Sequence, residues 1–234
     1  MRKALGGLAG IVAVATVATA MADSVTLKNP GFEAGSLRAW KTLEDGGGNW
    51  FVYKRGESYP EFKEVPPRGF AAPQGKYPRP PQGQRAAILT QETPGLNILH
   101  RVLRPKSDAS KNKLSFQLYY RNFGEDWSSP KSFDYGDDVL IPVRSGPKQP
   151  DPNQQVRIDL LKRDARVKSL KGADILATVL RTRNGDPKRR RWEPLRINLT
   201  KLGIDKPFRL RIAEVDNQGY VTVAVDALKL KFKP

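Results

Sequence analysis

Hydrophobic and polar residues alternate along three stretches of the chain, and this alternation limits the fold more than any other feature. The hydrophobic positions are Leu114, Phe116, Leu118 and Tyr120, then Phe208, Leu210 and Ile212, and then Val221, Val223 and Val225. Successive side chains of a β-strand point to opposite faces, so a period of two predicts strands with one buried face. No long segment shows the period of an amphipathic helix.

Shorter hydrophobic runs predict further strands between turn-forming segments. These runs are residues 50–54, 85–90, 96–103, 139–143, 156–162, 175–181 and 195–199. Residues 169–174 and 200–204 can each form one turn of helix. The segment Asp216-Asn217-Gln218-Gly219 separates two strands and predicts a β-hairpin. About ten strands with turns between them predict an all-β fold, a single antiparallel β-sandwich of the jelly-roll kind.

The N-terminal segment has the pattern of a secretory signal peptide. Arg2 and Lys3 precede an uncharged run over residues 4–22, which ends in the small-x-small sequence Ala20-Met21-Ala22. The alternative is an uncleaved membrane anchor, because the run is about long enough to span a bilayer. We therefore expect a signal peptide at residues 1–22, a single domain at 23–234 with no further membrane span, and a location outside the cell or in its envelope.

The composition excludes several classes of enzyme. The chain has no cysteine, which rules out disulfides, cysteine nucleophiles and zinc bound by thiolates. Its single histidine, His100, excludes a site built from several histidines, and no nucleophile motif accompanies it. No pair of carboxylates stands out for glycoside hydrolysis. We therefore expect a protein that is not an enzyme.

The net charge points to an anionic partner outside the cell. The chain has 41 Lys and Arg against 24 Asp and Glu, a net charge of +17. Loss of Arg2 and Lys3 with the signal peptide leaves +15, from 39 basic and 24 acidic residues. Such a balance is typical of nucleic-acid-binding proteins, but export and the lack of a known nucleic-acid-binding motif argue against that partner. An anionic cell-envelope polymer, an acidic polysaccharide or a membrane surface fits an exported protein better.

The two ends of the mature chain resemble those of galactose-binding-like jelly-roll domains, a group that includes secreted carbohydrate-binding modules. Residues 29–40 read Asn-Pro-Gly-Phe-Glu-Ala-Gly-Ser-Leu-Arg-Ala-Trp, similar to the family pattern Asn-Gly-Gly-Phe-Glu-x-Gly-x-x-x-x-Trp. Residues 219–230 resemble the closing strand, which usually ends in Asp-Asp-Val-x-Leu; here Ala227 replaces the second Asp. Residues 81–89 and 99–103 resemble two intervening strands. The resemblance covers about a third of the mature chain and implies that its first and last strands lie together.

This resemblance also implies one structural calcium ion held by Glu33 and Asp226. Many relatives hold calcium with the corresponding carboxylates and backbone carbonyls, and calcium prefers six to eight such oxygens. The hydrophobic register shifts near Asp226, from odd positions at Val225 and before to even positions at Leu228 and after. A bulge or twist there would turn the carboxylate out of the ladder. The alternative is that Glu33 is a turn or surface carboxylate and that Asp226 hydrogen-bonds the first strand without a metal.

Carbohydrate binding needs exposed aromatic faces with polar side chains beside them. The candidate ligand-binding residues are Trp50, Tyr53, Gln117, Tyr119, Arg121 and Trp192. The alternative is that the aromatic residues pack inside the sandwich or under long loops, as we expect of Trp40, which belongs to the family pattern.

The densest basic run is Lys188-Arg189-Arg190-Arg191, which would bind phosphates or sulfates through charge-assisted hydrogen bonds. The alternative is a solvated loop. Two functions therefore stay open. The first is a secreted, non-catalytic carbohydrate-binding protein, and the second is a basic adhesive or structural cell-surface protein that contacts an anionic partner.

Overall fold

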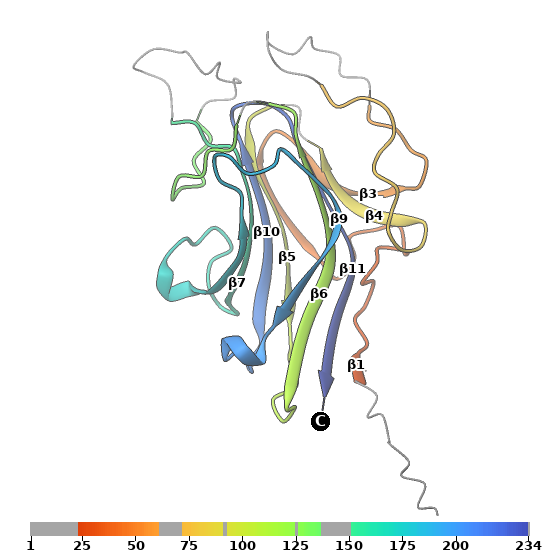
Figure 1. Ribbon diagram of the computed structural model, residues 1–234, viewed down its shortest axis with the longest axis vertical. Helices are drawn as coiled ribbons and strands as arrows, with labels where there is room; N and C mark the ends of the chain where they lie inside the picture. The colour runs from red at the N-terminus through yellow and green to blue at the C-terminus, as the bar shows by residue number, and fades with distance from the viewer. Residues whose placement is uncertain (1–22, 61–71, 91–92, 125, 137–150, 234) are drawn as a thin grey trace, which may run out of the picture.

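Two antiparallel sheets pack face to face in the computed structural model (Figure 1). The structure describes residues 23–60, 72–90, 93–124, 126–136 and 151–233. The predicted signal peptide and the predicted strand at 139–143 lie outside these residues. Within them, no helix is long and apolar enough to cross a bilayer. The all-β antiparallel sandwich predicted from the alternation is confirmed.

The two sheets have the following order. Sheet A consists of β3 (Asn49–Lys54), β4 (Arg85–Thr90), β11 (Val221–Lys233), β6 (Lys111–Asn122) and β9 (Arg189–Asn198), and β1 (Asp23–Val25) pairs with β11 past the end of β4. Sheet B consists of β2 (Lys41–Gly46), β5 (Gly95–Leu103), β10 (Phe208–Asp216), β7 (Gln155–Lys162) and β8 (Ile175–Arg181). The single turns η1 (Gly172–Asp174) and η2 (Thr200–Leu202) confirm the two predicted helical turns. The pairing of β1 with β11 confirms that the first and last strands lie together.

The predicted hairpin at residues 216–219 is wrong. This segment carries the chain from β10 in sheet B to β11 in sheet A, so the two strands do not pair. Asn217 and Gln218 are buried there. The Asn217 amide donates to the carbonyl oxygen of Asn153 at 3.0 Å, and the Gln218 amide donates to the side-chain oxygen of Gln154 at 3.1 Å. A turn pattern shows where the chain reverses but not which strand it pairs with afterwards.

The hydrophobic core lies between the sheets. Inward-facing positions of β6, β10 and β11 supply much of it, including Leu118, Ile212 and Val223. The rings of Phe32 and Trp40 stack there with centroids 5.5 Å apart, so the expected core position of Trp40 is confirmed.

A β-bulge in β11 keeps hydrophobic side chains on the inward face along the whole strand. The register with β6 shifts between Asp226 and Lys229, and Ala227 has a left-handed φ of 54°. The core-facing positions change from Val225 to Leu228 at this point. A shift of one residue moves every later side chain to the opposite face. The predicted irregularity at Asp226 is therefore confirmed.

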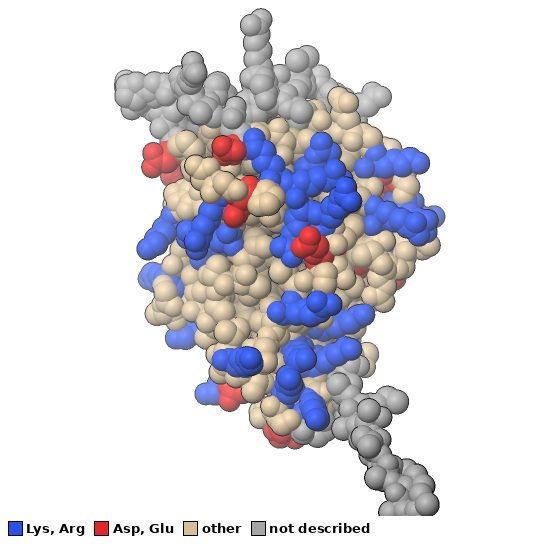
Figure 2. Space-filling model, viewed as in Figure 1, with Lys and Arg blue, Asp and Glu red and all other residues tan. Residues whose placement is uncertain are grey.

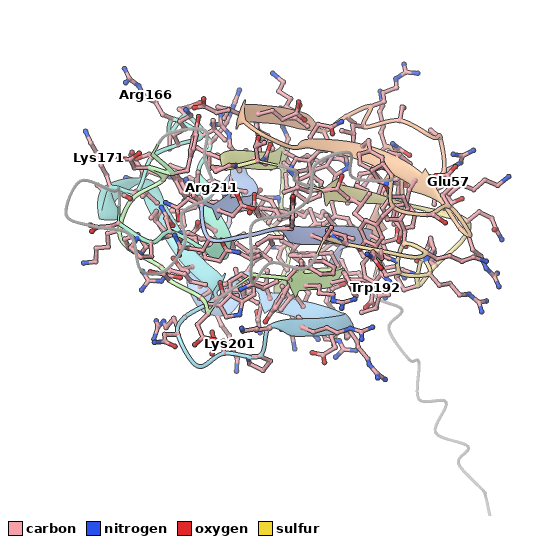
Figure 3. All side chains as sticks on the ribbon, turned by 90° about the horizontal axis from the view of Figure 1, so that it is seen from above. Glu57, Arg166, Lys171, Trp192, Lys201 and Arg211 are labelled. Carbon is pink, nitrogen blue, oxygen red and sulfur yellow. The ribbon has the colours of Figure 1, made fainter. Side chains whose placement is uncertain are left out.

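Loops cover the outer face of sheet B and part of that of sheet A. On sheet B, Arg211 and Asp159 are completely buried and lie 2.6 Å apart. Arg211 also donates to the carbonyl oxygens of Val167 and Ser169, both at 2.7 Å, which holds the loop between β7 and β8 against the sheet. Figure 3 shows Arg211 inside the molecule, while Arg166 and Lys171 from the same loop point outward.

Described loop residues cover the outer face of sheet A over β3, β4 and the adjoining parts of β11 and β6. Tyr59 and Tyr77 from the loop between these strands pack on Tyr53, Ile88 and Tyr119 of the sheet. The described part of this loop therefore buries the strand positions beneath it. The opposite half of the face, where β11, β6 and β9 run on past β4, carries a groove.

The bulge yields a first prediction. Replacing Ala227 with Val should lower the free energy of unfolding by about 1–3 kcal/mol, because a β-branched residue is strained at this positive φ. Replacing Ala227 with Gly, which adopts that φ freely, should keep or raise the stability. Urea unfolding followed by tryptophan fluorescence measures both values. An Ala227→Val protein as stable as the wild type would show that the bulge geometry is wrong.

A second prediction concerns Glu214, which is completely buried on the inward face of β10. Burial, and then repulsion from Asp216, raise the pKa of Glu214 well above its ordinary value. A raised folded-state pKa favours the protonated form. The stabilising contribution of protonated Glu214 is complete below the pKa of the carboxyl in the unfolded chain, about 4.3. It is lost as the pH rises towards the pKa in the folded protein, by up to about 1.4 kcal/mol per pH unit.

Replacing Glu214 with Gln should therefore leave stability nearly unchanged at pH 4 and raise it at pH 8. The matched control is Asp164→Asn, whose side chain is 94% exposed and should change stability at neither pH. Urea unfolding of both variants at the two pH values provides the measurement. A Gln variant that is no more stable than the wild type at pH 8 would contradict the assignment.

Candidate binding groove on sheet A

A groove of about 770 Å³ lies on the half of the outer face of sheet A that the described loops leave uncovered. Its floor consists of outward-facing positions of three neighbouring strands: Ser115 and Gln117 of β6, Pro194 and Arg196 of β9, and Lys229 and Lys231 of β11. Pro81 and Gln82 lie at one end, before β4, and Lys201 of η2 lies at the other.

The strand register arranges these side chains in rows across the sheet. Lys229 lies opposite Ser115, which lies opposite Arg196. In the next row Lys231 lies opposite Lys113, which lies opposite Asn198. The bulge makes this arrangement possible, because it turns Lys229 and Lys231 outward while Leu228 and Leu230 enter the core.

The groove is strongly basic. The cations among its described lining residues are Lys111, Lys113, Arg196, Lys201, Lys229 and Lys231, and these residues include no Asp or Glu. No ion pair links any of the six to a carboxylate of the described chain. Figure 2 shows Lys and Arg side chains gathered on this face of the molecule.

Of the six residues predicted to bind a ligand, Gln117 lines this groove. Trp50 lies in the core between the sheets and is 3% exposed. Tyr53 and Tyr119 are buried under the loop that follows β3, and the Tyr53 hydroxyl donates to the carbonyl oxygen of Pro78. Their ring faces are therefore not open to solvent, as the packing alternative expected.

The remaining two predicted ligand-binding residues, Arg121 and Trp192, lie on the outer face of sheet A but outside the groove. Trp192 is half-buried, with its ring centroid 5.8 Å from that of Tyr119. The guanidinium of Arg121 lies over the ring of Phe123, 4.2 Å from its centroid. The structure thus brings Tyr53, Tyr119 and Trp192 together in one cluster outside the groove, while Trp50 lies apart in the core.

The basic run at residues 188–191 does not reach the groove. It begins β9 and alternates in exposure, with Arg189 and Arg191 exposed and Arg190 half-buried. Lys188 lies 3.5 Å from Asp126, and Arg190 lies 3.1 Å from Glu193. Sequence reasoning missed the groove cations because they are spread over three strands and η2. The available signal was the alternation of Lys229, Lys231 and Lys233 with hydrophobic residues.

The structure brings Glu33 and Asp226 to the same turn, residues 82–85. Glu33 Oε1 accepts from the amides of Gln84 at 3.0 Å and Arg85 at 3.1 Å. Asp226 Oδ2 accepts from the amide of Gln82 at 3.3 Å. Glycine suits position 83, because its φ is 63° and a Cβ there would lie 2.1 Å from Glu33 Oε1, so that the Glu33 carboxylate would have to move.

This pair fits a hard cation in charge and donor type. Asp226 is 1% exposed. Burial raises its pKa to about 7, although the Ala227 and Gln82 amides act in the opposite direction, and repulsion from Glu33 adds to the rise. A cation between the two carboxylates would offset both effects. The described residues contain no cluster of three or more Asp, Glu, His or Cys side chains that could hold a metal ion, so backbone or amide carbonyl oxygens or waters would have to complete the ligand set.

Comparison with known proteins finds similarity in structure only. No protein-family model and no curated protein matches the sequence. Among solved structures, TmCBM61 in complex with β-1,4-galactotriose is 15% identical, with 88% of this chain and 97% of that chain covered and a TM-score of 0.45.

Two further structures match over nearly their whole length. The family 11 carbohydrate-binding module from Clostridium thermocellum, in complex with a mixed-linked tetrasaccharide, is 11% identical, with 91% and 96% covered and a TM-score of 0.41. The K3 cleaved adhesin domain of Lys-gingipain from Porphyromonas gingivalis W83 is 11% identical, with 90% and 99% covered and a TM-score of 0.45. These likenesses concern the fold alone, and the chain itself is an antiparallel jelly-roll sandwich with a basic groove on one outer face.

Proposed function

We propose that this chain is a secreted, non-catalytic carbohydrate-binding protein whose ligand lies in the groove on sheet A. The observation that carries the proposal is the groove itself, a concave site with a polar floor on a rigid sheet. Ser115, Gln117 and Asn198 offer hydroxyl and amide groups that match sugar hydroxyls. Pro81 and Pro194 add apolar surface for the C–H faces of a sugar ring.

The described lining residues of the groove offer no machinery for hydrolysis. Glycosidases use a pair of carboxylates that flank the scissile bond, and no carboxylate is among the described lining residues. His100 lies on β5 of the other sheet, where burial and nearby cations lower its pKa to about 4. These positions support binding without catalysis. The signal-peptide pattern at residues 1–22 supports export to the medium or the cell envelope.

A binding assay tests this function. The purified protein should bind one or more polysaccharides in a pull-down and on a glycan array. The double variant Ser115→Leu/Gln117→Leu should weaken that binding about tenfold or more, because it removes two hydrogen-bonding groups from the floor and keeps every charge. Isothermal titration calorimetry gives the affinities.

The matched control is Thr42→Leu, which changes an exposed strand position on sheet B and should leave the affinity unchanged. Circular dichroism confirms that the variants fold. Blank arrays and pull-downs with the wild-type protein would reject the function, and equal affinity of the floor variant and the wild type would reject the groove as the site.

We also propose that Glu33 and Asp226 hold one structural calcium ion beside the first and last strands. A ligand that binds only the folded state stabilises it, so calcium at a hundredfold excess over its dissociation constant should add about 2.7 kcal/mol. Calcium added to chelator-treated protein should therefore raise the melting temperature by several degrees. The Glu33→Gln variant should lose this response, whereas Asp164→Asn should retain it. A melting temperature that neither EDTA nor calcium changes would reject the ion.

A further inference from the structure

Four lysines at this end of sheet A lie opposite one another in two cross-strand pairs. Lys231 on β11 lies directly opposite Lys113 on β6, and Lys233 lies opposite Lys111 in the next pair. All four side chains are exposed at alternate positions of their strands. Like charges directly opposite each other on one face of a sheet are destabilising, so the protein retains an unfavourable arrangement here.

Protection of a sheet edge does not account for this arrangement. Lysines on edge strands prevent pairing with other chains, and that explanation suits Arg196 on the edge strand β9. It does not suit Lys113 or Lys231. The strand β6 lies between β11 and β9, and β11 pairs with β1 along the stretch that carries Lys231.

Seven Lys and Arg residues elsewhere on the described chain form ion pairs with acidic residues. Lys168 pairs with Asp45, Lys188 lies 3.5 Å from Asp126, and Arg190 lies 3.1 Å from Glu193. The six groove cations form no ion pair within the described residues. Unneutralised cations that surround a concave site attract and hold anionic groups.

We infer that the ligand of the groove is an acidic polysaccharide, with carboxylate or sulfate groups bound by the lysines of β6 and β11 and by Arg196. This inference rests on the proposed carbohydrate-binding function and adds the charge class of the ligand. Alternate positions of a strand lie about 6.7 Å apart and neighbouring strands about 4.8 Å apart. The cations therefore form a grid that contacts several anionic groups of one polymer at once.

The described lining residues offer no exposed aromatic ring, so neither nucleic-acid bases nor the sugar rings expected from the sequence stack in the groove. Single-stranded nucleic acid binds through bases stacked on exposed aromatic rings, and Phe116 is the only aromatic residue among the described lining residues. Its side chain belongs to the core and is 2% exposed. The floor instead offers Ser115, Gln117 and Asn198 for hydroxyl groups.

The experiment measures binding of the purified protein to polygalacturonate, to dextran sulfate and to neutral galactan over a range of NaCl concentrations. Affinity for an acidic polymer should fall at least about tenfold between roughly 50 mM and 500 mM NaCl, because salt screens exposed charges. Comparing polygalacturonate, which carries carboxylates, with dextran sulfate, which carries sulfates, shows which anionic group the groove binds more tightly. Double-stranded DNA and anionic lipid vesicles are measured under the same conditions.

Two triple variants with the same change in net charge locate the site. Lys113→Gln/Arg196→Gln/Lys231→Gln removes three groove cations. The matched control, Lys41→Gln/Arg166→Gln/Lys171→Gln, removes three exposed cations from sheet B and its loops. At low salt the groove variant should lose at least about tenfold in affinity for the acidic polymer and the control less than about twofold. Thermal melts show that both variants fold.

Several results would overturn the inference. Tight binding of neutral galactan with no preference for an acidic polymer would reject it and leave the proposed function standing. Equal losses in the two triple variants would reject the groove as the site of charge recognition. DNA or vesicles bound as tightly as the acidic polysaccharides would reject the polysaccharide as the specific partner. No binding of any polysaccharide would reject both the inference and the proposed function.

Discussion

The β-bulge between Asp226 and Lys229 is the constraint on which the rest of sheet A depends. The strand β11 pairs with β1, β4 and β6, so its register determines what faces the core and what faces outward over most of the sheet. The extra residue keeps Leu228 and Leu230 in the core and turns Lys229 and Lys231 into the groove. It also places Asp226 at the turn that holds Glu33. One backbone irregularity thus connects the core, the groove and the candidate calcium site.

Loops determine where a ligand can reach the sandwich. Arg211 and Asp159 hold a loop on sheet B, and a cluster of tyrosines holds another over β3 and β4 of sheet A. The described loops leave sheet A open where β11, β6 and β9 extend past β4. Hydrogen-bonding groups on the floor and cations around them make this groove suitable for a sugar polymer with negative charge. Under our proposal, the carbohydrate and the anionic partner suggested by the sequence would be a single ligand of this groove.

The sequence predicted strands best where their side chains alternate or form a hydrophobic run. The bounds of β4 and β8 agree with the predicted segments, and the parity change in β11 predicted its bulge. The strand β2 was missed because Leu43 is its only apolar residue apart from glycine. The hairpin was wrong because residues 216–219 join the two sheets, and their burial depends on Asn153 and Gln154, far away in the sequence.

The candidate site was predicted less well, and the reason is physical. The sequence by itself determined the two-faced strands, the excess of positive charge, the export pattern and the shift in register near Asp226. Only the tertiary structure decided that a loop buries Tyr53 and Tyr119, that Trp50 lies in the core, and that cations from three strands and η2 surround one groove. Exposure and charge density depend on which distant segments pack together. A period of two therefore shows that a side chain faces outward from its sheet but not whether solvent, a loop or a ligand lies above it.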